Sequence, residues 1–111
     1  MVNKVGSASP VRHGGLCAIV LFMFCSMNAM AADVFSGETI YNKRCEQCHS
    51  SDGRGLMPTM PDFSRAEKLM APDTHLYSQI SSGKGICPSY KGVLDRQEIL
   101  DVIVYLRTFY Q

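Results

Sequence analysis

Five consecutive residues in the middle of the chain have the types and the spacing of a chemical site. They are Cys45, Glu46, Gln47, Cys48 and His49, which read C-x-x-C-H. Two thiols three positions apart on a helical turn can each add to one vinyl group of a haem, and the histidine that follows can bind the iron. A zinc site would need further ligands and a redox dithiol a βαβ pattern, and the sequence offers neither. The motif therefore predicts one covalent haem c, with thioethers at Cys45 and Cys48 and His49 as the proximal iron ligand.

The start of the chain has the features of an export signal. Two basic residues and no acidic one precede an apolar run at 16–25 (LCAIVLFMFC), and the segment 29–31 (AMA) fits the small-x-small rule for signal peptidase. A membrane-spanning helix needs about 20 predominantly apolar residues, so this run is too short to be one. We expect residues 1–31 to be cleaved and residues 32–111 to form one monohaem domain. It should lie in the periplasm or an equivalent extracytoplasmic compartment, with no stable membrane span.

The composition limits the partners of this expected mature domain. Cleavage would leave 9 of the 11 Lys and Arg against 10 Asp and Glu, and these cations are scattered along the sequence. Nucleic-acid binding proteins cluster their cations, so we expect no nucleic-acid partner. Cleavage would also remove Cys17 and Cys25, which makes Cys87 an odd third cysteine in an oxidising compartment. A domain of 80 residues buries only a small hydrophobic core, and a covalently bound haem would supply the additional stabilisation that such a domain often needs.

Helical patterns flank the motif. Ser36 is placed to cap a helix that runs through Tyr41 into the cysteine motif. Residues 75–80 place their apolar side chains on one helical face, which ends at Gly83. A further short helical turn is expected within 63–71.

The end of the chain has the clearest helical pattern. Asp95 and Glu98 form a capping pair three residues apart. An apolar stripe follows at helical spacing: Ile99, Val102, Ile103, Leu106 and Phe109. Segments 50–61 and 83–92 are rich in Gly and Pro, which predicts loops. The expected fold class is all-α, with three to four short helices.

From residue 32 onward the chain resembles the class I cytochromes c over nearly its full length. Gly37 and Tyr41 match the first helix of that family, and residues 101–107 (DVIVYLR) match its last helix. The resemblance implies the cytochrome c fold, in which short helices wrap around one covalently bound haem and the first and last helices cross. It also implies an electron carrier that meets redox partner proteins.

The family has a loop that typically reads G-x-x-M-P-x-[FY]-x-G, whose methionine is the sixth ligand of the iron. Here residues 85–92 read GICPSYKG, so that Cys87 takes the position of the methionine. The resemblance thus implies His49 and Cys87 as the axial ligands. A thiolate is a strongly donating anion that favours Fe(III), so we expect a low reduction potential. Phe63 and Tyr90 are expected on the wall of the haem pocket.

Two alternatives for the sixth ligand stay open. One is a thioether from Met60, Met57 or Met70, and Met60 even begins an M-P-x-F sequence. Methionine in such a loop is more often a packing residue than a ligand. In the other alternative the iron is five-coordinate or weakly capped, and Cys87 is a free thiol or forms a disulfide with a partner. His75 lies at a helix start, where a polar residue is ordinary.

The leading function is electron transfer without catalysis of bond chemistry, although the chain could be a subunit of a larger oxidoreductase. The alternative is a haem-based sensor of CO or NO, in which Cys87 leaves the iron on reduction. The resemblance also allows a second cytochrome c chain as a heterodimer partner.

Overall fold

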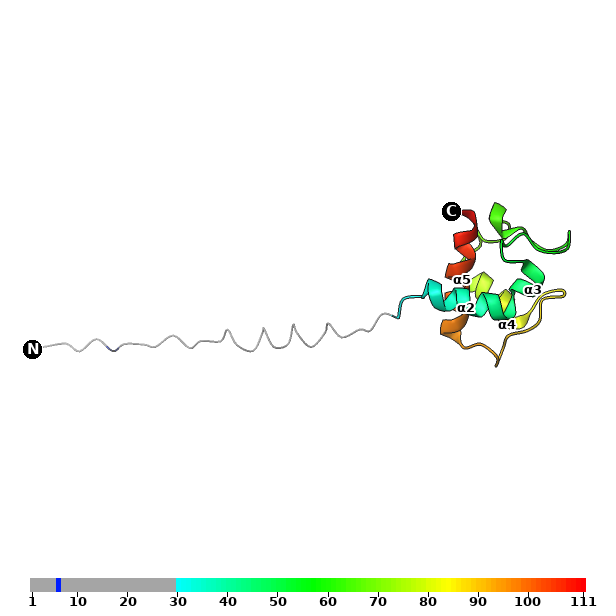
Figure 1. Ribbon diagram of the computed structural model, residues 1–111. Coiled ribbons are helices and arrows are strands. Elements are labelled where there is room, and N and C mark those ends of the chain that lie inside the picture. The colour runs from blue at the N-terminus through cyan, green and yellow to red at the C-terminus, as the bar shows by residue number, and fades with distance from the viewer. Residues whose placement is uncertain (1–5, 7–29) are drawn as a thin grey trace, which may run out of the picture. The chain divides into compact units, whose positions relative to one another are not determined.

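The computed structural model describes residue 6 and residues 30–111, and every helix it describes lies in the second range (Figure 1). These elements are α2 (Val34–Arg44), α3 (Glu46–His49), η1 (Phe63–Arg65), α4 (Asp73–Ser82), α5 (Arg96–Leu106) and η2 (Arg107–Tyr110), where η marks a 3₁₀ helix. The described residues contain no strand, only isolated bridges. The expected all-α class with three to four short α-helices is confirmed. The expected signal segment lies almost wholly outside the described residues, so its cleavage stays a prediction.

The ends of the two longest helices are set by side-chain caps. Asp95 caps α5 in a full capping box. Its carboxylate accepts from the backbone N–H of Glu98, and the carboxylate of Glu98 accepts from the backbone N–H of Asp95. This cap was expected from the sequence. The expected cap of α2 at Ser36 is wrong: the helix begins three residues earlier, and Asp33 accepts from the backbone N–H of Phe35. Aspartate and serine are comparable N-caps, so propensity alone could not choose between them.

Helices α2 and α5 cross at very short range, as the cyan and orange-red ribbons of Figure 1 show. The crossing point is Gly37, where an added Cβ would overlap the backbone carbonyl of Asp101 and stand 2.9 Å from the Cβ of Tyr105. Only a residue without a side chain permits this approach. The rings of Tyr41 and Tyr105 meet one turn further on, with centroids 5.3 Å apart. The expected crossing of the first and last helices is thereby confirmed.

The core lies along the inner face of α5. One cluster joins it to α2 and the η1 region, and consists of Tyr41, Phe63, Leu69, Val102 and Leu106. The other joins it to α4 and consists of Leu76, Ile99 and Ile103. Helix α4 is also tied to the end of the chain by Arg107, which pairs with Asp73 at 2.6 Å and donates to the carbonyl of Ala71. The apolar stripe that the sequence predicted is therefore the face that packs, and α5 continues beyond it as η2.

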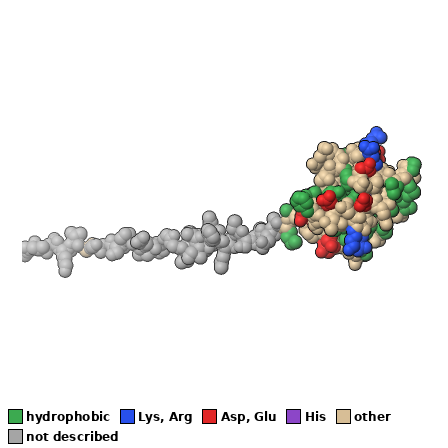
Figure 2. All heavy atoms as spheres, in the orientation of Figure 1, with side chains coloured by type: hydrophobic (Ala, Val, Ile, Leu, Met, Phe, Trp, Pro, Cys, Tyr) green, Lys and Arg blue, Asp and Glu red, His purple; other side chains and the backbone are tan. Residues whose placement is uncertain are grey.

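The surface mixes charges of both signs with apolar side chains on the face drawn in Figure 2. Some large apolar side chains are well exposed, such as Leu56 and Ile86 at 65% and 66%. No helix among the described residues has the length and apolar character needed to cross a bilayer.

Candidate functional site

A cavity of about 530 Å³ opens beside the C-x-x-C-H motif, between the helices and the two long loops. Its lining includes the thiols of Cys45, Cys48 and Cys87, and the ring of His49. Most of the remaining wall is apolar, from residues of α4, α5 and the segments before them, such as Leu69, Leu76, Ile80 and Leu106. A concave, largely apolar cavity with a few reactive groups, of a few hundred Å³, is typical of a site for a cofactor.

The motif lies at a break between two helices. Helix α2 ends at Arg44, and α3 begins again at Glu46. At the break the backbone N–H groups of Cys48 and His49 both donate to the carbonyl of Cys45, at 3.0 and 2.9 Å. The carbonyl of Arg44, which would have accepted from Cys48 in a continuous helix, is left without a helical partner. Cys45 at this break and Cys48 and His49 of the short helix α3 all lie on the cavity wall.

His49 is prepared as a ligand by what surrounds it. Its ring stacks on that of Phe63, with centroids 4.9 Å apart and planes 18° apart. Among the described residues its Nδ1 is the one buried side-chain nitrogen or oxygen without a hydrogen-bond partner. Such unpaired atoms are rare in native proteins, and a bound group is an ordinary reason for one. Burial lowers the pKa of His49, which favours the neutral imidazole that binds metals.

The three thiols of the described chain share the cavity and influence one another. Burial, with smaller contributions from the neighbouring thiols of Cys87 and Cys48, raises the pKa of Cys45 to about 11. The pKa of Cys87 is also raised by burial, and Cys48 adds to this, while a backbone hydrogen bond at Lys84 opposes it. All three cysteines are free of disulfides. In the protein alone, Cys45 and Cys87 are therefore neutral thiols.

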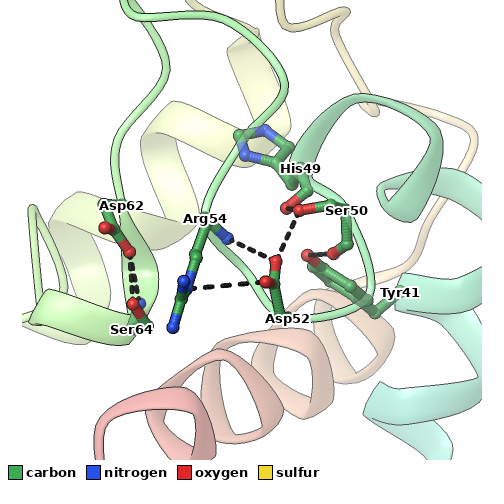
Figure 3. A network of polar contacts seen from close by, with 7 residues as sticks. All are labelled: Tyr41, His49, Ser50, Asp52, Arg54, Asp62 and Ser64. Atoms are coloured by element: carbon green, nitrogen blue, oxygen red, sulfur yellow. Dashed lines mark hydrogen bonds and ion pairs between the residues drawn. The ribbon is translucent and has the colours of Figure 1, made fainter.

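The loop after α3 is fastened by a polar network (Figure 3). The hydroxyl of Tyr41 donates to the carbonyl of Ser50 at 2.7 Å, and the hydroxyl of Ser50 donates to Asp52 at the same distance. Arg54 pairs with the other carboxylate oxygen of Asp52 at 3.5 Å. Burial raises the pKa of Tyr41 well above its usual range, so that this hydroxyl keeps its proton. The network fixes the backbone directly after His49, and with it the position of the imidazole.

The same loop also forms backbone hydrogen bonds to carbonyl groups of α3 that have no partner within the helix. The backbone N–H of Gly55 donates to His49 and that of Leu56 to Cys48, both at 3.0 Å. Further along, the N–H of Phe63 donates to the carbonyl of Gly53 at 2.8 Å. These bonds satisfy orphan groups of the helix end. They also bring the ring of Phe63 under His49.

The segment 83–92 forms the wall that carries Cys87. It leaves α4 at Gly83, whose φ of +76° favours glycine and where a Cβ would stand 2.8 Å from the carbonyl oxygen of Cys87. It returns along the end of α4, where the N–H groups of Tyr90 and Lys91 donate to the carbonyls of residues 80 and 81. The hydroxyl of Tyr90 crosses the cavity edge and donates to Arg44 at 2.9 Å. Tyr90 itself is buried.

Some of the residues predicted from the sequence for this site line the cavity, and others do not. Those that line the cavity are Cys45, Cys48, His49, Met60, Phe63, Cys87 and Tyr90. Met57 and Met70 do not line it, and Met70 is 79% exposed. His75 is exposed and bonds Gln79 at 2.8 Å. None of these positions assigns the sixth ligand, so both Cys87 and Met60 stay candidates from geometry alone.

Two hydrogen-bond acceptors were not predicted from the sequence, one at the crossing of α2 and α5 and one at the edge of the cavity. One is Asp101, which is buried on α5 and accepts from the backbone N–H of Asp33 at 2.8 Å and from Gln97 at 2.9 Å. The other is the carbonyl of Arg44, which accepts from Tyr90. An acidic residue inside an otherwise apolar stripe was the only signal for the first, and a backbone group gives no sequence signal at all.

Helices wrapped around a cavity that presents a C-x-x-C-H motif define the class of the c-type cytochromes, and comparisons with known proteins agree. Residues 32–106 match the family described as "Cytochrome C oxidase, cbb3-type, subunit III". The chain is 34% identical over 95 residues to cytochrome c6 of Nostoc sp., which covers 82% of this chain and 85% of that protein. It is 28% identical over 99 residues to cytochrome c6 of Thermostichus vulcanus, covering 86% and 88%.

A solved structure gives the same fold. Cytochrome c6 from the diatom Phaeodactylum tricornutum superposes with a TM-score of 0.58 at 24% identity, covering 71% of this chain and 95% of that one. The family match over residues 32–106 and the relative at 34% identity show that this chain belongs to the family of c-type cytochromes. It is an electron-transfer protein with one covalent haem c and its iron.

The residues present fit such a haem. Two free thiols stand where thioethers form, a neutral imidazole has an unpaired buried nitrogen, and the cavity beside them is apolar. Cys45 and Cys48 would hold the group covalently, and His49 would bind its iron.

Proposed function

We propose that this chain transfers electrons through its haem c with His49 and Cys87 as axial ligands, and at a lower potential than a His/Met cytochrome. The observation that carries the proposal is the position of Cys87 on the cavity wall. The sequence resemblance, which matches Cys87 to the methionine of the family's loop, supports it. Met57 and Met70 lie off that wall, which leaves Met60 as the one competing thioether among the methionines considered. A thiolate stabilises Fe(III) more strongly than a thioether does.

When bound, the haem supplies an iron that gains and loses one electron. The chain's own residues set the conditions for that exchange. His49 is held by its stack on Phe63 and by the fixed backbone at Ser50, so that little has to move when the charge changes. The largely apolar wall would limit the contact of a bound haem with water. The neutral thiol of Cys87 would give up its proton on binding a metal, because the metal replaces it.

We further propose that residues 1–31 are removed on export and that residues 32–111 work in the periplasm or an equivalent compartment. The family match begins at residue 32, which agrees with this boundary. Redox proteins are the partners. Pairing with a second cytochrome c chain stays a prediction from the resemblance.

The test is a redox titration of the haem-loaded protein. Cys87→Met should raise the midpoint potential on the order of 0.1 V or more, since axial ligands alone set haem potentials over about 0.8 V. Met60→Leu is the matched control on the same cavity wall and should leave the potential nearly unchanged. A large shift in Met60→Leu with none in Cys87→Met would overturn the proposed ligand.

Addition of CO to the reduced wild-type protein tests the carrier role itself. A carrier that keeps both axial ligands should not change its absorption spectrum. Rapid binding of CO would contradict this role and favour the sensor instead.

A further inference from the structure

The segment 83–92 is held to the rest of the domain by two sets of hydrogen bonds that differ in reach. One set is local and ties the segment to the end of α4. It consists of the N–H groups of Tyr90 and Lys91 and the hydroxyl of Ser89, which donates to the carbonyl of Ser81 at 2.7 Å. The other set has one member among the described residues: the hydroxyl of Tyr90, which donates to the carbonyl of Arg44, 46 positions away.

The acceptor of this long-range bond exists because of the haem motif. The helix break at Cys45 draws the N–H of Cys48 to the carbonyl of Cys45 and leaves that of Arg44 without a helical partner. Tyr90 satisfies this carbonyl. The bond therefore joins the residue directly before the first haem-binding cysteine to the segment that carries Cys87.

The local bonds do not connect the segment to the haem motif. They join the segment only to the end of α4, the element from which it leaves, so they can break together when the segment opens. Gly83 and Gly92, with φ of +76° and +78°, lie at its two ends, where the backbone is least restricted. Most of the segment is exposed, and Tyr90 is its one buried side chain. Among the hydrogen bonds of the described residues, only that of the Tyr90 hydroxyl spans from this segment to the backbone directly before the motif.

From this geometry we propose that Tyr90 is a positioning residue for the sixth ligand: its hydroxyl holds the segment 83–92 closed, and so keeps Cys87 on the cavity wall. The inference rests on the proposed role of Cys87. Loss of the hydroxyl should leave the ring in the core and the fold intact, but allow the segment to open more often.

The experiment uses the haem-loaded protein and the variant Tyr90→Phe, which removes one oxygen atom. Once Cys45 and Cys48 form thioethers, Cys87 is the remaining thiol of residues 32–111. Its rate of alkylation by iodoacetamide in the oxidised protein therefore measures opening of the segment. Loss of one hydrogen bond should raise the open fraction, and with it the rate, by about tenfold. Hydrogen exchange of the amides of Tyr90 and Lys91 should rise by a similar factor.

Two matched variants control for the chemistry and for stability. Ser89→Ala also removes a hydroxyl-to-carbonyl bond from this segment, but a local one, and should raise the alkylation rate much less than Tyr90→Phe. Tyr41→Phe removes a hydroxyl-to-carbonyl bond of 2.7 Å from a buried tyrosine on the His49 side of the cavity. It should lower global stability without selective exposure of Cys87.

The outcomes separate the inference from the proposal beneath it. If Tyr90→Phe reacts and exchanges no faster than Ser89→Ala, the positioning role is wrong, whatever the ligand is. If wild-type Cys87 reacts as fast as a free thiol, its role as a ligand is wrong. Hydrogen exchange in Tyr90→Phe then still decides whether the hydroxyl holds the segment closed.

Discussion

The crossing of α2 and α5 and the segment 83–92 are both close to the haem site, yet they are built in different ways. At the crossing, two helices touch through their backbones at Gly37, and the surrounding side chains are buried. The segment is mostly exposed and relies on a few hydrogen bonds and on glycines with positive φ. Packing of the first kind sets whether the domain folds. We expect contacts of the second kind to hold Cys87, the proposed sixth ligand, in place.

This contrast predicts that substitutions in the two regions separate stability from ligation. Damage at the crossing should lower the free energy of unfolding and leave the spectrum of the folded protein unchanged. Damage in the segment should change the spectrum and have little effect on the free energy of unfolding.

Gly37→Ala should have the largest effect. Its Cβ would overlap the carbonyl of Asp101, so the helices must separate, and overpacking of this kind costs about 3 kcal/mol. Urea unfolding of the haem-loaded protein measures the loss. Gly92→Ala is the control, since a Cβ there meets nothing within 4 Å and only the φ of +78° is strained, at about 1 kcal/mol. An equal decrease in the free energy of unfolding in the two variants would contradict the proposed difference in stability between the crossing and the segment.

Asp101→Ala should come next. It leaves the backbone N–H of Asp33 without its acceptor and frees the side chain of Gln97, so we expect a loss of about 2 kcal/mol. Gln97→Ala, which removes only one of these bonds, should cost less. The measurement is again urea unfolding, together with the absorption spectrum of the folded protein. A changed spectrum in Asp101→Ala would show that the crossing does control the ligands.

Gly83→Ala should have a smaller effect on stability and a larger one on the site. The φ of +76° costs about 1 kcal/mol for a residue with a side chain. Its Cβ would also press on the carbonyl of Cys87 and shift the segment. Gly85→Ala has comparable strain, with φ of +61°, but meets no atom within 4 Å. The spectrum should change in Gly83→Ala alone, and an identical response from both variants would contradict the account.

The same two regions show how far the sequence could be interpreted. The crossing was predictable, because Gly37, Tyr41 and the stripe on α5 are patterns of residue type and spacing. The capping box of α5 was predictable for the same reason, since it depends on two residues three positions apart. The prediction of haem attachment at Cys45, Cys48 and His49 depends on a motif just as local.

The wall of the cavity was only partly predictable. Phe63, Tyr90 and Cys87 were expected there from the resemblance, and they line it. The bond between Tyr90 and Arg44 was not foreseen, because its acceptor is a backbone carbonyl freed by a helix break. Asp101 was missed because burial of a carboxylate depends on partners distant in sequence. Contacts between distant segments are decided by packing, which a single sequence does not display.

The most direct test of the proposed His49 and Cys87 ligation is electron paramagnetic resonance of the oxidised, haem-loaded protein beside its Cys87→Met variant. We predict a low-spin ferric signal of the thiolate-bound type in the wild type, which Cys87→Met replaces with that of a His/Met haem. A wild-type spectrum already of the His/Met type, unchanged by Cys87→Met, would contradict the account.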